Sequence, residues 1–190
     1  MKKILSITST IVLLSSTLMA SNISKEEKQM IAGEAKQAIK TIGGGLLKEV
    51  KKNMKEGGPV GAAVFCAHNA TQLTQKLSKN LNEGVTVRRI TNKPRNTNNV
   101  AKNDFEQSVL DMMEKDDRKK HPVIKKLSEN HYQVYKPIRM KDKCLLCHGD
   151  NNTRNKEAYK EILSKYPNDK ATGYQLGEFR GAFLVDIVKK

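Results

Sequence analysis

The run Cys144-Leu145-Leu146-Cys147-His148 constrains this chain more than any other feature of its sequence. A C-x-x-C-H run is the attachment signature of c-type haem, in which the two thiols add across the vinyl groups of the porphyrin. The two-residue gap matches the separation of those vinyls, and the histidine that follows is delivered to one axial face of the iron. We therefore expect one covalently attached haem c, with Cys144 and Cys147 as thioether residues and His148 as an iron ligand.

Two other uses of a C-x-x-C pair fit this sequence less well. A zinc site needs ligands at the corners of a tetrahedron, and the adjacent residues Cys147 and His148 cannot easily occupy two of them. A thioredoxin-like redox pair stands at a helix N-terminus after a strand, whereas the charged residues 141–143 precede the motif here. The sequence therefore favours haem over both alternatives.

The first twenty residues have the pattern of a secretory signal peptide. Lys2 and Lys3 form a positive start, residues 4–19 are apolar and rich in serine and threonine, and Ala20 is a small residue suited to cleavage. An uncleaved membrane anchor is the alternative, but a spanning helix needs roughly 20 apolar residues. We expect residues 1–20 to be removed, which leaves residues 21–190 as a single haem-binding domain. Export predicts a periplasmic protein whose haem is attached by haem-maturation machinery.

The chain is strongly basic, with a formal net charge of +15 from 35 basic and 20 acidic residues. Such a charge favours acidic protein partners or an anionic membrane surface through long-range attraction. Nucleic acid is disfavoured, because the five tyrosines and four phenylalanines are not interleaved with basic residues as stacking platforms would be. We expect an acidic redox or signalling protein as the partner, with contact to a membrane surface as a further option.

Hydrophobic periodicity predicts an α+β domain. Ser24 and Glu27 form a capping box for a long N-terminal helix, in which the three glycines 43–45 predict a kink or close backbone packing. The glycines 57–58 end this helix, and Pro59 suits the first turn of the next one. Strands separated by irregular and helical segments predict an antiparallel sheet with helices on one side. The remaining predicted elements are helices at 59–81, from 103, after 122 and at 155–165, strands at 85–91, 132–138 and 182–188, and loops at 93–99, through the C-x-x-C-H motif and at 166–181.

Four runs of the sequence together resemble one known family. They are AAVFCAHNA at 62–70, VRRITNKPRNTNN at 87–99, CLLCHG at 144–149 and YPNDKATGYQLGEFRGAFLV at 166–185. Their order is similar to that in a family of c-type haem domains long catalogued as a domain of unknown function, and the resemblance covers residues 25–188. It implies a PAS-like fold with a central antiparallel sheet, long N-terminal helices and one c-type haem. It also implies an axial ligand pair, which here falls on His148 and Cys66.

Cys66 has one rival as the second axial ligand. The chain departs from the family directly after Cys66, and His68 lies in the departing stretch. On a helix the two residues point about 200° apart, so only one of them can face the iron. A third cysteine left unpaired in an exported protein favours Cys66, although a free cysteine also serves as a small buried hydrophobe.

Arginines are the candidates for binding the haem propionates, because a guanidinium group pairs with a carboxylate through two parallel hydrogen bonds. The candidates are Arg88, Arg89, Arg95 and Arg180, each of which also suits a plain surface charge. Arg95 and Arg180 are preferred because they lie in runs shared with the family. Asn96 and Tyr174 are their expected polar neighbours.

Two protein ligands on the iron leave no open position for a substrate, which argues against an enzyme. The sequence then favours a haem-based sensor of redox state or of a small gas, since a thiolate holds ferrous iron weakly. A periplasmic electron-transfer cytochrome is the alternative, because one low-spin haem and a basic surface suffice for it. The sensor hypothesis requires a separate partner protein to carry the signal.

Overall fold

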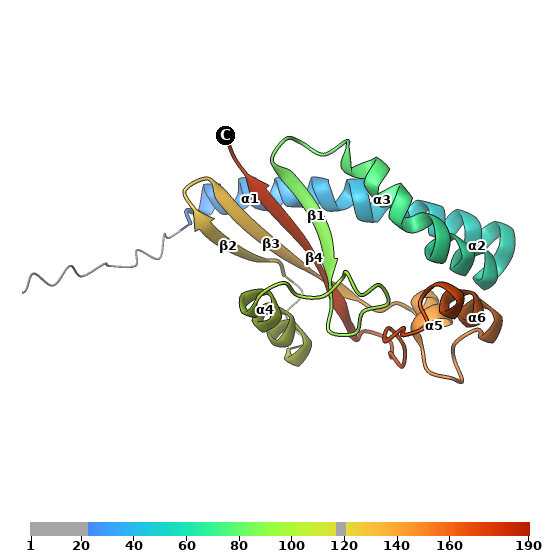
Figure 1. The fold of residues 1–190 in the computed structure, drawn as a ribbon. Coiled ribbons are helices and arrows are strands. Elements are labelled where there is room, and N and C mark those ends of the chain that lie inside the picture. The colour runs from blue at the N-terminus through green and yellow to red at the C-terminus, as the bar shows by residue number, and fades with distance from the viewer. Residues whose placement is uncertain (1–22, 117–120) are drawn as a thin grey trace, which may run out of the picture.

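The computed structural model describes residues 23–116 and 121–190. The predicted signal peptide, residues 1–20, lies outside the described residues. Within them, no helix is both long and apolar enough to cross a membrane. They form an α+β domain in which long helices precede a four-stranded antiparallel sheet, which confirms the fold class expected from the resemblance (Figure 1).

A four-stranded antiparallel sheet forms the centre of the domain. Its strands are β1 (Val85–Ile90), β2 (Val123–Ser128), β3 (His131–Arg139) and β4 (Phe179–Val188). They lie in the order β1-β4-β3-β2, and every neighbouring pair is antiparallel. Val185 of β4 lies opposite both Val87 of β1 and Val134 of β3, so β4 fixes the register across the middle of the sheet.

A nearly continuous series of helices precedes the sheet. The predicted capping box is present, because Ser24 Oγ accepts a hydrogen bond from the Glu27 N–H at 3.0 Å and the Glu27 carboxylate accepts one from the Ser24 N–H at 3.3 Å. The series consists of α1 (Lys25–Ile39), α2 (Gly45–Val64) and α3 (Ala70–Ser78), joined by the π-helical segments η1 (Lys40–Gly44) and η2 (Phe65–Asn69).

The chain reverses direction inside α2, at the predicted break. Gly57 and Gly58 leave helical geometry, and Gly58 has φ of 60° and ψ of −157°. Glycines let the helical segments before and after this break approach each other closely. A Cβ atom on Gly45 would lie 2.6 Å from Cδ1 of Leu77 in α3, and one on Gly61 would lie 2.8 Å from a backbone oxygen of the segment before the break. The close packing expected for residues 43–45 is therefore present.

Helices cover both faces of the sheet, so the expectation of helices on one side is wrong. α1 packs on one face through Ile31 and Ala35. α4 (Asp104–Lys115) packs on the other face through Leu110. The physical reason lies in β4, where the successive residues Leu184 and Val185 are both buried and each joins a different core. A strand that is apolar on both sides needs a cover on both sides.

Three local predictions differ from the structure. The segment after Pro122 is strand β2 and not a short helix, because it forms a hairpin with β3. The C-x-x-C-H motif lies on α5 (Asp142–His148) and not in a loop. β4 begins at Phe179, upstream of the predicted start at residue 182. The predicted N-cap Asn155 does begin the next helix, α6 (Lys156–Lys165), and α5 and α6 lie together at one end of the sheet beside α2 (Figure 1).

Candidate functional site

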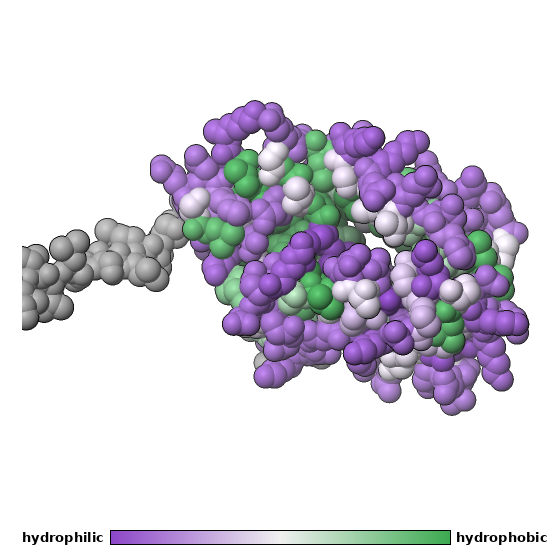
Figure 2. Space-filling view, viewed as in Figure 1, coloured by the Kyte–Doolittle hydropathy of each residue, from purple (hydrophilic) through white to green (hydrophobic). Residues whose placement is uncertain are grey.

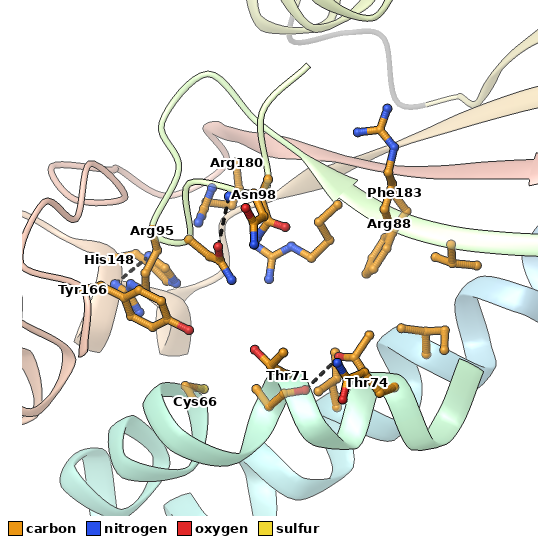
Figure 3. Close-up of a pocket in the computed structure, with 18 residues that line it drawn as sticks. Cys66, Thr71, Thr74, Arg88, Arg95, Asn98, His148, Tyr166, Arg180 and Phe183 are labelled. Atoms are coloured by element: carbon orange, nitrogen blue, oxygen red, sulfur yellow. Dashed lines mark hydrogen bonds between the residues drawn. The ribbon is translucent and has the colours of Figure 1, made fainter. Parts of the chain in front are cut away.

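A cavity of about 350 Å³ opens between the helices and the sheet. η2 and α3 form one wall, and β1, residues 91–99 and the end of α5 lie opposite them (Figure 3). Figure 2 shows a hollow at this place, rimmed by hydrophilic side chains. Among its lining residues are seven named as candidates from the sequence: Cys66, Arg88, Arg89, Arg95, Asn96, His148 and Arg180.

The two motif cysteines lie one turn apart on α5, so they face the same side of that helix. Cys144 packs against the buried cluster of Met140, Ala171 and Tyr174. Cys147 packs against the buried cluster of Ala63, Ala158 and Ile162. All three cysteines of the chain are free. Burial raises the pKa of the Cys147 thiol, and the positive charge of Arg95 offsets part of that rise. Cys147 is therefore held as a thiol at neutral pH.

His148 lies half-buried at the end of α5, with its ring fixed by a backbone carbonyl. Nδ1 lies 2.7 Å from the carbonyl oxygen of Ala171, and since a carbonyl oxygen only accepts hydrogen bonds, Nδ1 carries the proton. The free electron pair is then on Nε2, the atom available to a metal. Desolvation lowers the pKa of His148 well below its usual 6.5, and the positive charges of Arg95 and Arg180 lower it further. The imidazole is neutral at physiological pH, as a ligand must be.

Cys66 faces the cavity from the other wall, in the π-helical segment η2 (Figure 3). Single π-helical turns within α-helices occur frequently at functional sites. The rival His68 is exposed and does not line the cavity. The geometry therefore favours Cys66 over His68. Burial raises the pKa of the Cys66 thiol, and nearby Cys147 acts in the same direction.

Arg89 and Arg180 bring unbalanced positive charge to the cavity. The Nε atoms of both are buried and have no hydrogen-bond partner among the residues that the structure describes. Burial lowers the pKa of both side chains, that of Arg180 to about 10, and the mutual repulsion of the neighbouring arginines adds to the effect. Nη1 of Arg180 donates hydrogen bonds to Thr91 Oγ1 and to the Lys93 carbonyl, so only part of its guanidinium is satisfied. Because a buried donor without an acceptor is costly, this part of the cavity suits a ligand with carboxylate groups.

The other two candidate arginines already have carboxylate partners. Arg95 donates a hydrogen bond from Nε to Asp169 at 3.1 Å. Arg88 forms an ion pair with Glu106 of α4, whose side chain is only 3% exposed. Paired guanidinium groups have fewer free donors for propionates, so the geometry favours Arg89 over Arg95. The sequence held a signal for this, because Arg89 alternates with Val85 and Val87 along the strand that faces the cavity.

Of the two expected polar neighbours, only Asn96 lines the cavity. Its Oδ1 accepts a hydrogen bond from the Asn98 N–H at 3.0 Å. The Tyr174 ring is buried behind the cavity and meets the His148 ring edge-on, with centroids 6.4 Å apart. Tyr174 therefore contacts the site through His148, and its role toward a propionate stays a prediction.

Two residues that sequence reasoning missed support the site from behind. Asp169 and Ala171 hold Arg95 and His148. Both lie in the run at 166–185, but the run alone does not show which of its residues contact the site, and Ala171 acts through its backbone. Within residues 23–116 and 121–190, no group of three or more His, Cys, Asp or Glu side chains could hold a metal ion. The zinc alternative therefore gains no support.

A family model settles the resemblance of the four runs. The model of the Tll0287-like family, described as Tll0287, matches residues 13–187. The chain belongs to the Tll0287-like family. The crystal structure of the cyanobacterial heme-protein Tll0287 resembles this Tll0287-like chain with a TM-score of 0.60 at 22% identity, over 88% of this chain and 98% of that one. This likeness shows a shared fold. No curated protein matches the chain.

Proposed function

We propose that this chain binds one c-type haem in the cavity and serves as a sensor of redox state or of a small gas. The observation that carries the proposal is the placement of Cys66 and His148 on opposite walls of one cavity, with the C-x-x-C-H helix at its end. The unpartnered Nε atoms of Arg89 and Arg180 support it, because haem brings two propionates that need cations.

Each residue has a separate task in this proposal. Bound haem supplies a one-electron couple and an iron with two axial positions. Cys144 and Cys147 each add an S–H across one vinyl group and form the thioether bonds. His148 offers Nε2 from one wall, and Cys66 offers its sulfur from the other. With both ligands in place no substrate position remains, so we propose no enzymatic reaction.

The sensor role is favoured over the carrier role by the way Cys66 is held. The helix that carries Cys66 begins after the break at Gly57 and Gly58 and passes through a π-helical turn, and breaks of this kind are where a helix can shift on a change of ligand. An electron carrier is the second candidate, which the net charge of +15 favours. In either role we place the protein in the periplasm, after removal of residues 1–20 and haem attachment by the maturation machinery, with an acidic protein as its partner.

Production of the full chain together with haem-maturation machinery tests the binding. The colour should stay with the protein after acid-acetone extraction, at one haem per chain. The double variant Cys144→Ala/Cys147→Ala should lose all covalent haem, whereas Cys66→Ala should retain it because its sulfur only coordinates. A colourless wild-type protein from that host would contradict the proposal.

Spectra of the loaded protein test the second ligand and the role. Cys66→Ala should change the oxidised spectrum and admit cyanide, while His68→Ala should change nothing; the reverse result would move the ligand to His68. A reductive titration with CO and NO then separates the two roles. Binding of CO to the reduced protein supports the sensor, and refusal of CO at every accessible pH leaves the electron carrier.

A further inference from the structure

Asp169 is a carboxylate without access to solvent directly behind the cavity. Its side chain is 0% exposed. Oδ1 accepts a hydrogen bond from the Ala171 N–H at 2.8 Å. Oδ2 accepts a hydrogen bond from Nε of Arg95 at 3.1 Å, and it forms an ion pair with Nη2 of the same side chain at 3.0 Å. Both oxygens are thus committed to protein groups, and charge-assisted bonds of this kind are strong and directional.

The first set of bonds leads from Asp169 to the His148 ring through Ala171. The carboxylate holds the N–H of Ala171, and the carbonyl of the same residue accepts the bond from His148 Nδ1 at 2.7 Å. The segment is pinned beyond Ala171 as well, because the Tyr174 N–H donates to the carbonyl of His148 at 3.0 Å. The carbonyl that selects the tautomer of His148 is therefore held from both sides.

The second set of bonds connects Asp169 to the His148 ring through Arg95. Nη2 of Arg95 donates to the carbonyl of Cys147 at 2.9 Å and lies 3.3 Å from His148 Nδ1. A guanidinium charge this close to a ring that must coordinate a cation opposes its function. The carboxylate of Asp169 forms an ion pair with Arg95 and offsets that charge.

We propose that Asp169 is a positioning residue for His148. It fixes the ring orientation and the Nδ1-protonated tautomer through Ala171, and it balances the charge of Arg95 beside the ring. The inference rests on the proposed role of His148 as a haem ligand, but its first consequence is visible in the haem-free chain. Groups behind a metal-binding histidine commonly have this task.

The first test measures the His148 tautomer by nitrogen-15 NMR in the full-length, haem-free chain labelled at histidine. Asp169→Asn keeps the size and one acceptor oxygen but loses the charge and the second acceptor, so the Nδ1-protonated fraction should fall. The matched control is Asp150→Asn, since Asp150 also follows the motif and accepts backbone N–H bonds from Asn152 and Thr153 without touching Ala171. An Nδ1-protonated fraction equal to that of the wild type would overturn the tautomer role.

The second test measures the reduction potential of the loaded protein. Asp169→Asn should raise the potential, because Arg95 then acts unopposed, and Arg95→Gln should lower it, because Asp169 then acts unopposed. The double variant should return toward the wild type. A purely structural role for Asp169 predicts no rise of the potential in Asp169→Asn. The double variant removes both charges of the pair, so its difference from Arg95→Gln measures the effect of Asp169 even if Asp169→Asn alone does not fold.

Different results would refute the proposed haem binding and the positioning role of Asp169. Absence of covalent haem in the wild type would refute the proposed function and leave the tautomer test valid. Covalent haem in the wild type, with equal potentials in Asp169→Asn, Arg95→Gln and Asp150→Asn, would refute the positioning role alone.

Discussion

The two walls of the cavity are held in different ways. The anchored wall, α5 with residues 166–174, is tied by bonds between segments far apart in the sequence, such as His148 to Ala171 and Gly173 to Gly149. The helical wall, residues 40–81, carries Cys66. Within the described residues, its side-chain hydrogen bonds run only to backbone oxygens four positions earlier, from Thr41, Asn53, Thr74 and Ser78.

This contrast assigns the two walls different mechanical roles. Small residues such as Ala62, Ala63 and Ala67 pack the helical wall, and apolar packing has no preferred direction. Directional bonds from both sides fix the anchored wall. One candidate ligand is therefore fixed while the other can shift, which is the asymmetry that a ligand-dependent signal needs.

The largest expected effect lies on β1, opposite the helical wall, where substitutions of the adjacent Arg88 and Arg89 should change the free energy of unfolding in opposite directions. Arg88→Met removes the cation that forms an ion pair with the buried carboxylate of Glu106. The free energy of unfolding should fall by roughly 2–3 kcal/mol, less than for a fully buried pair because Arg88 is partly exposed. Arg89→Met removes a buried cation whose Nε has no partner, so the haem-free chain should gain on the order of 1–3 kcal/mol. Urea unfolding of the haem-free chains measures both.

The same two variants measured in the haem-loaded protein supply the control. Once propionates are present, Arg89→Met should lose its advantage, since the wild-type cation then has a partner. Equal destabilisation by Arg88→Met and Arg89→Met in the haem-free chain would show that Arg89 is paired, and the cavity would then lack its free cation.

The sequence predicts residues that line the cavity, such as Cys66 and His148, better than the groups that hold them. The C-x-x-C-H motif and Cys66 are recognisable because their proposed chemistry depends on residue type and spacing. The short run 123–128 has no decisive period, so the sequence predicts a helix there and only its pairing with β3 shows that it is a strand. The sequence does not reveal the position of Asp169 beside Arg95, because Arg95 lies 74 residues earlier in the chain and the contact depends on the fold.

The next test introduces backbone strain into the helical wall, at the break inside α2. Gly58 has φ of 60° and ψ of −157°, a region open only to glycine, so Gly58→Ala should lower the free energy of unfolding by roughly 1–3 kcal/mol. Gly57→Ala is the matched control, because Gly57 has φ of −130° and a Cβ there meets nothing within 4 Å. In the loaded protein, Gly58→Ala should also alter the spectrum that reports Cys66. Equal stabilities of the two variants would mean that the turn is not fixed by Gly58.

The smallest expected effect compares one histidine from each wall. His148 of the anchored wall has a pKa well below 6.5 because it is desolvated beside Arg95 and Arg180, whereas His68 of the helical wall is exposed. Below about pH 6.5 the unfolded chain therefore takes up a proton that folded His148 refuses. The haem-free chain should lose stability as the pH falls through this range, by up to about 1.4 kcal/mol per pH unit, and above it His148 contributes no slope.

Urea unfolding between pH 5 and 7 measures this slope, above the range in which Glu27 and Asp150 contribute, since the pKa values of both carboxyl groups are lowered. His148→Asn should flatten the slope, and His68→Asn should leave it unchanged. An unchanged slope in His148→Asn would mean that the ring opens to solvent in the haem-free chain. The anchored wall would then depend on haem for its rigidity, and the difference between the two walls would arise only after haem is attached.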